Sequence, residues 1–228
     1  MRRPRFIAEQ ARHASGWLGR VIAFIMARET WAENQRAMDA LDLQAGDHVI
    51  DIGCGHGRSL AALAARTTKG RVVGVDPSDL MTEIAVDRNR ALIKAGKVKV
   101  AIASAGDLPF DAEAFDKALC VHVIYFWKDL RTSFREIARV LTPGGRFVLV
   151  FRTDADDAAV AAFPADVYSF RSLSEITAAL TDAGFAVDDE LLAQQQGKTP
   201  TLLVATKQQA ADLPAQTMAT TEGRLHAN

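Results

Sequence analysis

The sequence predicts an α/β protein with a doubly wound, seven-stranded, mostly parallel sheet and one antiparallel strand at its edge. Short apolar runs alternate with helical segments from residue 48 onward, and several runs are apolar throughout, as buried parallel strands are. A glycine-rich turn follows the first run. With 228 residues, 49% of them hydrophobic, the chain is long enough for one sizeable core with attachments.

The alternation sets the expected elements in order. The first five strands are expected at residues 48–52, 71–76, 97–101, 117–123 and 146–151. Helices are expected between them at residues 58–66, 79–94 and 130–141. The turn Pro143-Gly144-Gly145 is expected to end the third helix and begin the fifth strand.

The last part of the sheet is expected to form a hairpin. A loop-rich section covers residues 153–169, and a helix at residues 172–183 is expected to end at Gly184. Two further strands are expected at residues 185–192 and 201–206. The loop between them is too short for a parallel crossover, so the two strands are predicted to pair antiparallel at the sheet edge.

Segments outside the sheet divide the chain into three parts. Residues 1–43 are expected to form an N-terminal helical lid, residues 44–206 the ligand-binding domain, and residues 207–228 a flexible polar tail. The leader carries six arginines by residue 28, which suits a transit peptide or a membrane-surface helix. Its apolar stripe from Trp17 to Met26 is explained more simply by packing on the domain. No apolar run approaches the roughly 20 residues that span a bilayer, so no stable membrane insertion is expected.

Charge and cysteine content narrow the function classes. The 27 basic and 28 acidic residues leave a net charge of −1, which gives no electrostatic footprint for nucleic acid. The two cysteines form no CxxC pair, so neither a disulfide framework nor a structural zinc site is expected, and a reducing cytoplasm is favoured. Acids between residues 154 and 157 are interpreted as a solvated loop rather than a metal site. A homodimer is compatible with the sequence.

The stretch VIDIGCGHG at residues 49–57 is the first specific functional signal. A dinucleotide-binding turn needs the pattern GxGxxG, but here the glycines are Gly53, Gly55 and Gly57, and Arg58 occupies the place of the third. Asp51 is expected to point from the strand end into the same crevice. A carboxylate there would repel a phosphate but accept hydrogen bonds from an ammonium group.

Asp76 closes the second strand and supplies a second anchor. A carboxylate in that place accepts hydrogen bonds from the vicinal hydroxyls of a ribose, as in adenosine sites. An ammonium acceptor, a glycine turn and a ribose clamp together describe an aminoacyl nucleoside. The common ligand of that kind is S-adenosyl-L-methionine.

From about residue 40 to residue 206 the chain resembles a class I S-adenosylmethionine-dependent methyltransferase of the methyltransferase-11-like, small-molecule kind, a Rossmann-like fold. Four ordered motifs carry the resemblance: DIGCGHG, GVDPS, LPFDAEAFD and LTPGGRFVLV. It implies that Asp51, Gly53 and Gly55 line the methionine end of the cofactor and that Asp76 binds its ribose. The cofactor-binding candidates are Asp51, Gly53, Cys54, Gly55, Asp76, Pro77, Met81, Ser104, Ala105 and Val121.

The resemblance also implies how adenine is held. Pro77 and Met81 are expected to flank the ring. In many relatives an Asp four residues before the LPF triplet meets the adenine amino group, and here Ser104 stands in that place, followed by Ala105, whose backbone amide would reach the ring. A serine accepts a weaker hydrogen bond than a carboxylate.

His122 is the candidate catalytic base. It stands at the carboxyl end of the fourth strand, where ligands bind in open α/β sheets, and its ordinary pKa suits proton removal near neutrality. The alternative is a histidine that only walls the cofactor pocket. The residues after it, Tyr125, Phe126 and Trp127, form an aromatic wall or pack under the next helix.

The substrate chamber is expected to draw on two further segments. Trp17 of the leader would close over the crevice, and the section around Tyr168 and Arg171 opens at the same end of the sheet. The substrate-binding candidates are therefore Trp17, Tyr125, Tyr168 and Arg171. A modest, partly apolar small molecule is the expected methyl acceptor, and the sequence leaves open whether oxygen, nitrogen or carbon is methylated.

Two functions of different kinds remain open at this point. The first is a small-molecule methyltransferase, and the second is a non-catalytic cofactor-binding module with a regulatory or scaffold role. A nicotinamide-dependent dehydrogenase is a distant third, because the glycine spacing is wrong and no Tyr-x-x-x-Lys pair is present.

Overall fold

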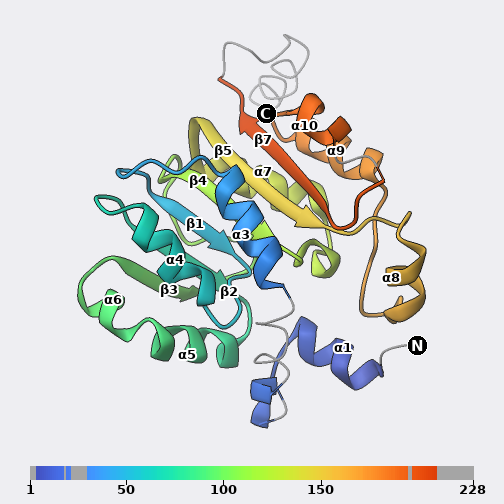
Figure 1. Ribbon diagram of the computed structural model, residues 1–228, viewed down its shortest axis with the longest axis horizontal. Helices are drawn as coiled ribbons and strands as arrows, with labels where there is room; N and C mark the ends of the chain where they lie inside the picture. The colour runs from blue at the N-terminus through green and yellow to red at the C-terminus, as the bar shows by residue number, and fades with distance from the viewer. Residues whose placement is uncertain (1–3, 18, 22–29, 195–196, 210–228) are drawn as a thin grey trace, which may run out of the picture.

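The computed structural model describes residues 4–17, 19–21, 30–194 and 197–209 (Figure 1). Its centre is a seven-stranded sheet in the order β3-β2-β1-β4-β5-β7-β6. The strands are β1 (Val49–Ile52), β2 (Val72–Asp76), β3 (Val98–Ile102), β4 (Phe115–Val121), β5 (Leu141–Phe151), β6 (Phe185–Val187) and β7 (Thr201–Lys207). The five strands β1 to β5 pair in parallel, and β7 runs antiparallel to both β5 and β6.

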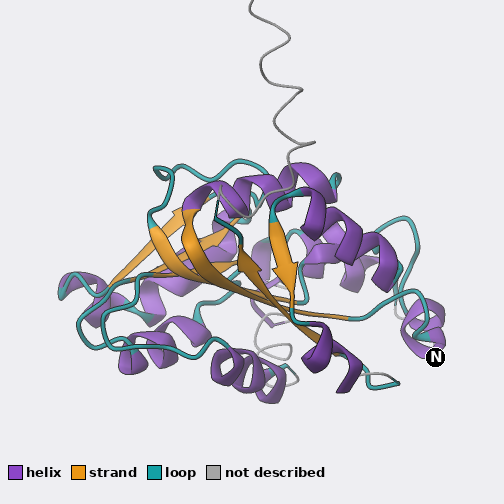
Figure 2. Cartoon of the chain, turned by 90° about the horizontal axis from the view of Figure 1, so that it is seen from above, coloured by secondary structure: helices purple, strands orange, loops and turns teal. Residues whose placement is uncertain are grey.

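Helices cover both faces of this sheet (Figure 2). The described helices are α1 (Arg5–Arg12), α3 (Trp31–Ala40), α4 (Arg58–Arg66), α5 (Asp79–Arg88), α6 (Arg90–Lys94), α7 (Leu130–Val140), α8 (Asp157–Ala162), α9 (Leu173–Asp182) and α10 (Asp189–Gln194), with a 3-10 turn, η1 (Ile124–Phe126). The doubly wound α/β prediction is confirmed.

Two apolar clusters form the core, one on each face of the sheet. On one side Ile50 and Ile52 of β1 pack with residues of α7 and α9, and on the other Val49 packs with residues of α3 and α4. Alternate side chains of one strand therefore serve opposite faces. Every residue of β1 and β2 is buried, which explains why these strands read as continuous apolar runs that each contain or end in an aspartate.

The reversed strand does not occupy the edge of the sheet, where the hairpin was expected to place it. β7 lies between β5 and β6 and pairs with six residues of β5, and the short β6 takes the edge. The strand expected at 185–192 ends at Val187, because the Asp188 carboxylate accepts a hydrogen bond from the backbone N–H of Leu191 at 3.0 Å and starts α10. β7, which is longer and more buried than β6, thus lies inside the sheet.

Three other boundaries differ from expectation. The helix expected at 79–94 is broken at Asn89, whose buried side-chain amide donates to the carbonyl oxygens of Gly57 (2.8 Å) and Ala85 (2.9 Å). α8 interrupts the section expected to be loop, because Asp156 caps its first turn. The Pro143-Gly144-Gly145 turn is an irregularity inside β5 rather than a separate connection.

The N-terminal segment lies beyond the carboxyl ends of the parallel strands (Figure 1). The Ser78 hydroxyl donates to the carbonyl oxygen of Ala14 at 3.0 Å, and Arg5 forms an ion pair with Asp166 at 3.1 Å. Most of the predicted apolar stripe after Trp17, and the expected tail from residue 210 onward, lie outside the described residues. No helix of the described part is long and apolar enough to cross a membrane.

Candidate active site

Asp51 is a buried carboxylate at the start of the site. It lies in β1, is 4% exposed, and accepts a short hydrogen bond from the hydroxyl of Ser59 at the start of α4. Burial raises the pKa of Asp51 to about 7, against the lowering effect of the Ser59 hydrogen bond. The protein alone therefore compensates the ionised form of Asp51 incompletely, and a cationic ligand group would stabilise that form.

The glycine loop turns sharply after β1. Gly53, Gly55 and Gly57 all have positive φ angles, and the N–H groups of Gly53 and Cys54 donate to the carbonyl oxygen of Val75. A Cβ on Gly53 would stand 2.4 Å from Cγ1 of Val123, whereas a Cβ on Gly55 would meet nothing within 4 Å. The loop is thus packed at Gly53 and open at Gly55, where a ligand can approach the backbone.

Asp76 joins the glycine loop to the loop after β2. One of its oxygens accepts from the backbone N–H of Gly55 at 3.0 Å, and the other accepts from that of Ser78 at 2.9 Å. Burial raises the pKa of Asp76, and the two backbone hydrogen bonds oppose that rise. Each carboxylate oxygen retains capacity for a further donor, as a pair of ribose hydroxyls would require.

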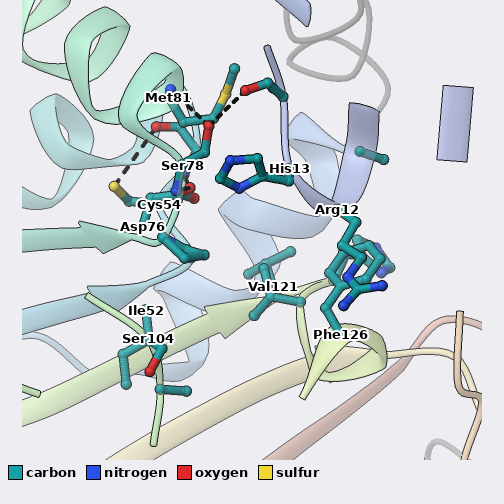
Figure 3. Close-up of a pocket in the computed structure, with 18 of the residues that line it drawn as sticks. Arg12, His13, Ile52, Cys54, Asp76, Ser78, Met81, Ser104, Val121 and Phe126 are labelled. Carbon is teal, nitrogen blue, oxygen red and sulfur yellow. Dashed lines mark hydrogen bonds between the residues drawn. The ribbon is translucent and has the colours of Figure 1, made fainter. Parts of the chain in front are cut away.

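A cavity of about 960 Å³ opens at this end of the sheet (Figure 3). All ten predicted cofactor-binding residues line it, from the Asp51 loop to the Ser104–Ala105 segment and Val121. They come from the carboxyl ends of β1, β2 and β4 and the loops that follow β1, β2 and β3, with Met81 in the first turn of α5. Parallel strands bring their carboxyl ends to one edge, so the tertiary structure brings these residues together as expected.

The four predicted substrate-binding residues do not line this cavity. Trp17 is 76% exposed, and Arg171 forms an ion pair with Glu175 at 2.9 Å. Tyr125 and Tyr168 are buried within an aromatic cluster, with the Tyr168 ring centroid 4.5 Å from that of Phe163. Tyr125 and Tyr168 therefore belong to the core beside the cavity, whereas Trp17 and Arg171 lie outside its lining.

Other aromatic residues provide the wall. Phe126, the last residue of η1, and Trp127, which follows it, line the cavity together with Trp31 at the start of α3. The guanidinium of Arg58 lies 3.9 Å from the Trp31 ring centroid, a cation–π contact. Phe126 and Trp127 were part of the predicted aromatic wall. Trp31 was missed, because its only signal is a position at the start of a helix within the expected lid.

His122 has an unusual backbone. Its φ angle is +59°, a left-handed conformation that is uncommon for residues other than glycine. Its N–H nevertheless donates to the carbonyl oxygen of Val150 at 2.8 Å, which continues the ladder of β4 and β5. Strained conformations of this kind persist where surrounding contacts hold them.

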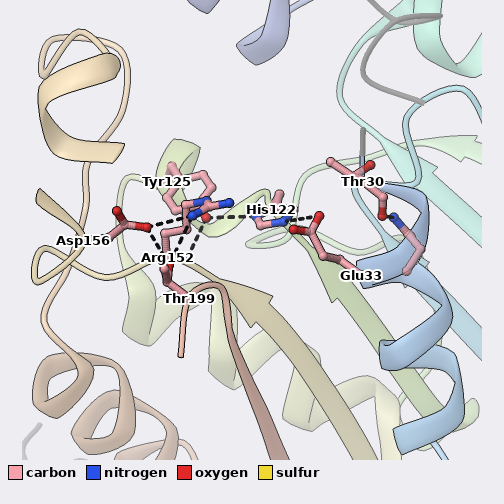
Figure 4. A network of polar contacts seen from close by, with 8 residues as sticks. Thr30, Glu33, His122, Tyr125, Arg152, Asp156 and Thr199 are labelled. Carbon is pink, nitrogen blue, oxygen red and sulfur yellow. Dashed lines mark hydrogen bonds and ion pairs between the residues drawn. The ribbon is translucent and has the colours of Figure 1, made fainter. Parts of the chain in front are cut away.

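Both ring nitrogens of His122 have partners (Figure 4). Nε2 lies 3.1 Å from Oε2 of Glu33 in α3, and Nδ1 lies 3.0 Å from the hydroxyl of Tyr125. That hydroxyl also accepts from the backbone N–H of Arg152 at 2.7 Å, so its proton is available to Nδ1. The pattern fits a ring that carries its proton on Nε2 and donates it to Glu33.

The contacts of His122 continue through a wider polar network. Arg152 pairs with Asp156 at 2.7 Å and donates to the hydroxyl of Thr199 at 3.2 Å. The hydrogen bond from His122 lowers the pKa of Glu33. Glu33 is a residue that the sequence did not single out. The network ties α3 to the ends of β4 and β5 beside the cavity (Figure 4).

The other histidines of the site differ from His122. His56 is in the glycine loop, where its Nδ1 accepts from the backbone N–H of Arg58 and faces Arg88 at 3.1 Å. Burial lowers the pKa of His56 to about 4, so the ring is neutral and supports the loop. His13 lies on the cavity wall near Asp76 (Figure 3). Within the described residues, no three His, Cys, Asp or Glu side chains lie close enough together to hold a metal ion.

Comparisons with known proteins agree with this geometry. Residues 50–149 match the family model of the Methyltransf_11 methyltransferase domain. The chain is 35% identical over 149 residues to the O-methyltransferase cnsE of Penicillium expansum, across 63% of this chain and 54% of that protein. It is 36% identical over 130 residues to the methyltransferase GfsG of Streptomyces halstedii, across 56% of this chain and 46% of that protein. The chain spans about half the length of the curated relatives it matches.

A solved structure shares the fold. The geranyl diphosphate C-methyltransferase of Streptomyces coelicolor A3(2), determined with Mg²⁺, geranyl diphosphate and S-adenosyl-L-homocysteine, matches with a TM-score of 0.63 and 23% identity over 78% of each chain. The sheet order, the glycine loop with its two buried carboxylates and the family match lead to one conclusion. Residues 50–149 of this chain match the Methyltransf_11 methyltransferase domain, and the sheet around them has the class I fold of S-adenosylmethionine-dependent methyltransferases.

Proposed function

We propose that this chain transfers a methyl group from S-adenosyl-L-methionine to a small, partly apolar molecule. The observation that carries the proposal is one cavity that joins two buried carboxylates, Asp51 and Asp76, to an aromatic wall of Trp31, Phe126 and Trp127. The first half suits an aminoacyl nucleoside, and the second suits an apolar acceptor.

The residues of the first half fit the cofactor. Asp51 offers a buried carboxylate to an ammonium group, and Asp76 offers two oxygens with remaining acceptor capacity to a ribose. Met81 and Ala105, both buried and both on the cavity wall, offer apolar surface to an adenine. When bound, the cofactor supplies a methyl group on a positively charged sulfur that is a good leaving group.

The protein's contribution is then mainly alignment. Holding an acceptor in line can supply roughly 7–11 kcal/mol, whereas a general base adds on the order of a hundred- to ten-thousand-fold. His122 has a partner on each ring nitrogen. We therefore propose that His122 shapes the cavity and fixes Glu33, and that it does not take the acceptor's proton. The N-terminal segment over the strand ends is proposed to exclude water.

An oxygen atom is the proposed methyl acceptor. Relatives that match 101 to 149 residues of this chain are named O-methyltransferases. A hydroxyl group that releases its proton to solvent before it enters the cavity arrives as an oxygen anion and needs no base at the site. A hydroxylated, partly apolar metabolite is accordingly the proposed substrate class.

The test begins with binding and proceeds to turnover. Calorimetric titration with S-adenosylmethionine, S-adenosylhomocysteine and NADH is expected to show binding of the two sulfur nucleosides only. A panel of hydroxylated metabolites is then screened with isotope-labelled methyl donor, and His122→Asn is expected to keep a substantial fraction of any activity found. Binding of NADH alone contradicts the proposal, and nucleoside binding without any methylated product favours a non-catalytic module.

A further inference from the structure

Two acidic residues on the cavity wall outside the cofactor candidates, Glu9 and Asp129, have hydrogen-bond partners within the protein. Glu9 accepts from Arg5 at 2.8 Å. Asp129 accepts from the hydroxyl of Thr132 at 2.7 Å and from the backbone N–H of Arg131 at 2.9 Å, and the Thr132 hydrogen bond keeps the pKa of Asp129 below its usual value. Arg5 offsets the charge of Glu9, whereas Asp129 stays ionised and its two hydrogen bonds hold it against the start of α7.

Two basic residues on the cavity wall, Arg12 and Lys128, have side chains without such partners in the described residues. Arg12, in the last turn of α1, and Lys128, between η1 and α7, both line the cavity. Within the described part of the chain, no hydrogen bond or ion pair joins either side chain to another residue. The side-chain N–H donors of Arg12 and Lys128 are therefore available to a ligand in the cavity.

The position of Arg12 separates it from the cofactor end of the cavity. Figure 3 shows Arg12 and Phe126 on the side of the cavity away from Cys54, Ser78 and Met81. Lys128 follows Phe126 and Trp127 directly in the chain. Arg12 thus lies on the same side of the cavity as Phe126, and Lys128 adjoins Trp127 in the chain, so both cations are near the aromatic wall where the acceptor is proposed to lie.

We propose that the methyl acceptor carries an anionic group, a carboxylate or a phosphate, that Arg12 and Lys128 bind while its apolar body packs on Phe126 and Trp127. A guanidinium presents paired N–H donors that match the oxygens of either anion. Both side chains are exposed, so salt screens their long-range attraction and direct hydrogen bonds to the anion carry the expected selectivity. This inference rests on the proposed function, because it assigns the substrate class of the same site.

Matched probes test the charge directly. Binding of 4-hydroxybenzoate, phenyl phosphate and the neutral 4-hydroxybenzamide is measured by calorimetry, once with the protein saturated with S-adenosylhomocysteine and once without it. At least one anion is expected to bind about tenfold or more tightly than the amide, as charge-assisted hydrogen bonds predict. The stronger of the two anions distinguishes a carboxylate from a phosphate.

Variants connect the preference to the two cations. The preference for the anion over the amide is expected to fall severalfold in Arg12→Gln and in Lys128→Gln and to disappear in the double variant. The affinity for S-adenosylhomocysteine is expected to stay unchanged. Arg131→Gln is the control, because Arg131 pairs with Asp182 at 2.8 Å and does not line the cavity. Failure of both anions to bind, or a preference that survives in the double variant, overturns this inference. Failure of S-adenosylhomocysteine to bind overturns the proposed function instead.

Discussion

The Oε2 atom of Glu33 lies 3.1 Å from Nε2 of His122, although the two residues are 89 positions apart. This contact joins α3, which carries Trp31 of the cavity wall, to the carboxyl end of β4. Because the hydrogen bond favours the ionised carboxylate, it lowers the pKa of Glu33. The position of one cavity wall thus depends on a titratable group.

This contact predicts an acid-sensitive contribution to stability. The folded-state pKa of Glu33 is below its ordinary value of 4.5, so the contribution is present above that pH and lost as the pH falls through the lowered pKa. Glu33→Gln is expected to lose less unfolding free energy than the wild type on acidification from pH 6 to pH 3, measured by urea denaturation. Glu190→Gln, at an exposed position of α10, is the control. An unchanged acid profile in Glu33→Gln argues against the contact.

The raised pKa of Asp51 predicts the opposite dependence of stability on pH. Its folded-state pKa is raised from 3.8 to about 7, so its stabilising contribution is complete below 3.8 and disappears as the pH rises to about 7. Relative to Asp51→Asn, the ligand-free wild type is expected to lose unfolding free energy between pH 4 and pH 7. Thermal unfolding across this range measures the difference, and parallel curves for the two proteins contradict it.

The same group makes cofactor affinity depend on pH. An ammonium group requires the ionised carboxylate, which is the minor form of Asp51 below pH 7. The affinity for S-adenosylhomocysteine is expected to be about tenfold lower at pH 6 than at pH 8, because only the ionised fraction binds. Calorimetry at the two values checks this. Equal affinities would place the ammonium group elsewhere.

Asp76 is expected to control both the loop and the nucleoside. In Asp76→Ala the backbone N–H groups of Gly55 and Ser78 lose their acceptors, which costs about 1–3 kcal/mol where such groups stay unsatisfied. Affinity for S-adenosylhomocysteine is expected to fall by about a hundredfold or more, since two hydroxyl contacts of a charged acceptor disappear as well. Asp79→Asn, exposed at the start of α5, should bind normally. Normal binding by Asp76→Ala would refute the ribose assignment.

Gly53 and Gly144 form a matched pair for the glycine loop. Their φ angles are +76° and +77°, so an alanine strains both backbones equally, by about 1–3 kcal/mol. Only at Gly53 would the added Cβ also meet Val123, and overpacking costs about a further 1–3 kcal/mol. Gly53→Ala is expected to unfold at lower urea concentration than Gly144→Ala and to lose cofactor binding. Equal midpoints would mean that Val123 moves aside.

The cofactor half of the site could be predicted from the sequence because its residues stand at strand ends. Asp51 and Asp76 follow or lie within buried apolar runs, and the glycines mark the turn between them. Parallel strands bring such positions to one edge whatever the rest of the chain does. The role of Asn89 could not be predicted in this way, because Asn89 stands between α5 and α6 and reaches Gly57 only through the folded structure.

The acceptor half could not be predicted in the same way. Tyr125 lies two positions before Trp127, yet η1 turns Tyr125 into the core and leaves Trp127 on the cavity wall. Arg12 and Trp31 reach the cavity only because the N-terminal segment returns to the sheet through contacts such as Ser78 with Ala14. Nothing local in the sequence encodes that return.

The parallel strands, the glycine loop and the two carboxylates could be inferred from the sequence alone, because periodicity and turn residues act over a few positions. The contacts of His122 with Glu33 and Tyr125, and the shared cavity of Arg12 and Lys128, became visible with the folded chain. These arrangements depend on contacts between distant segments, whose partners are selected by packing and by the need to satisfy buried polar groups.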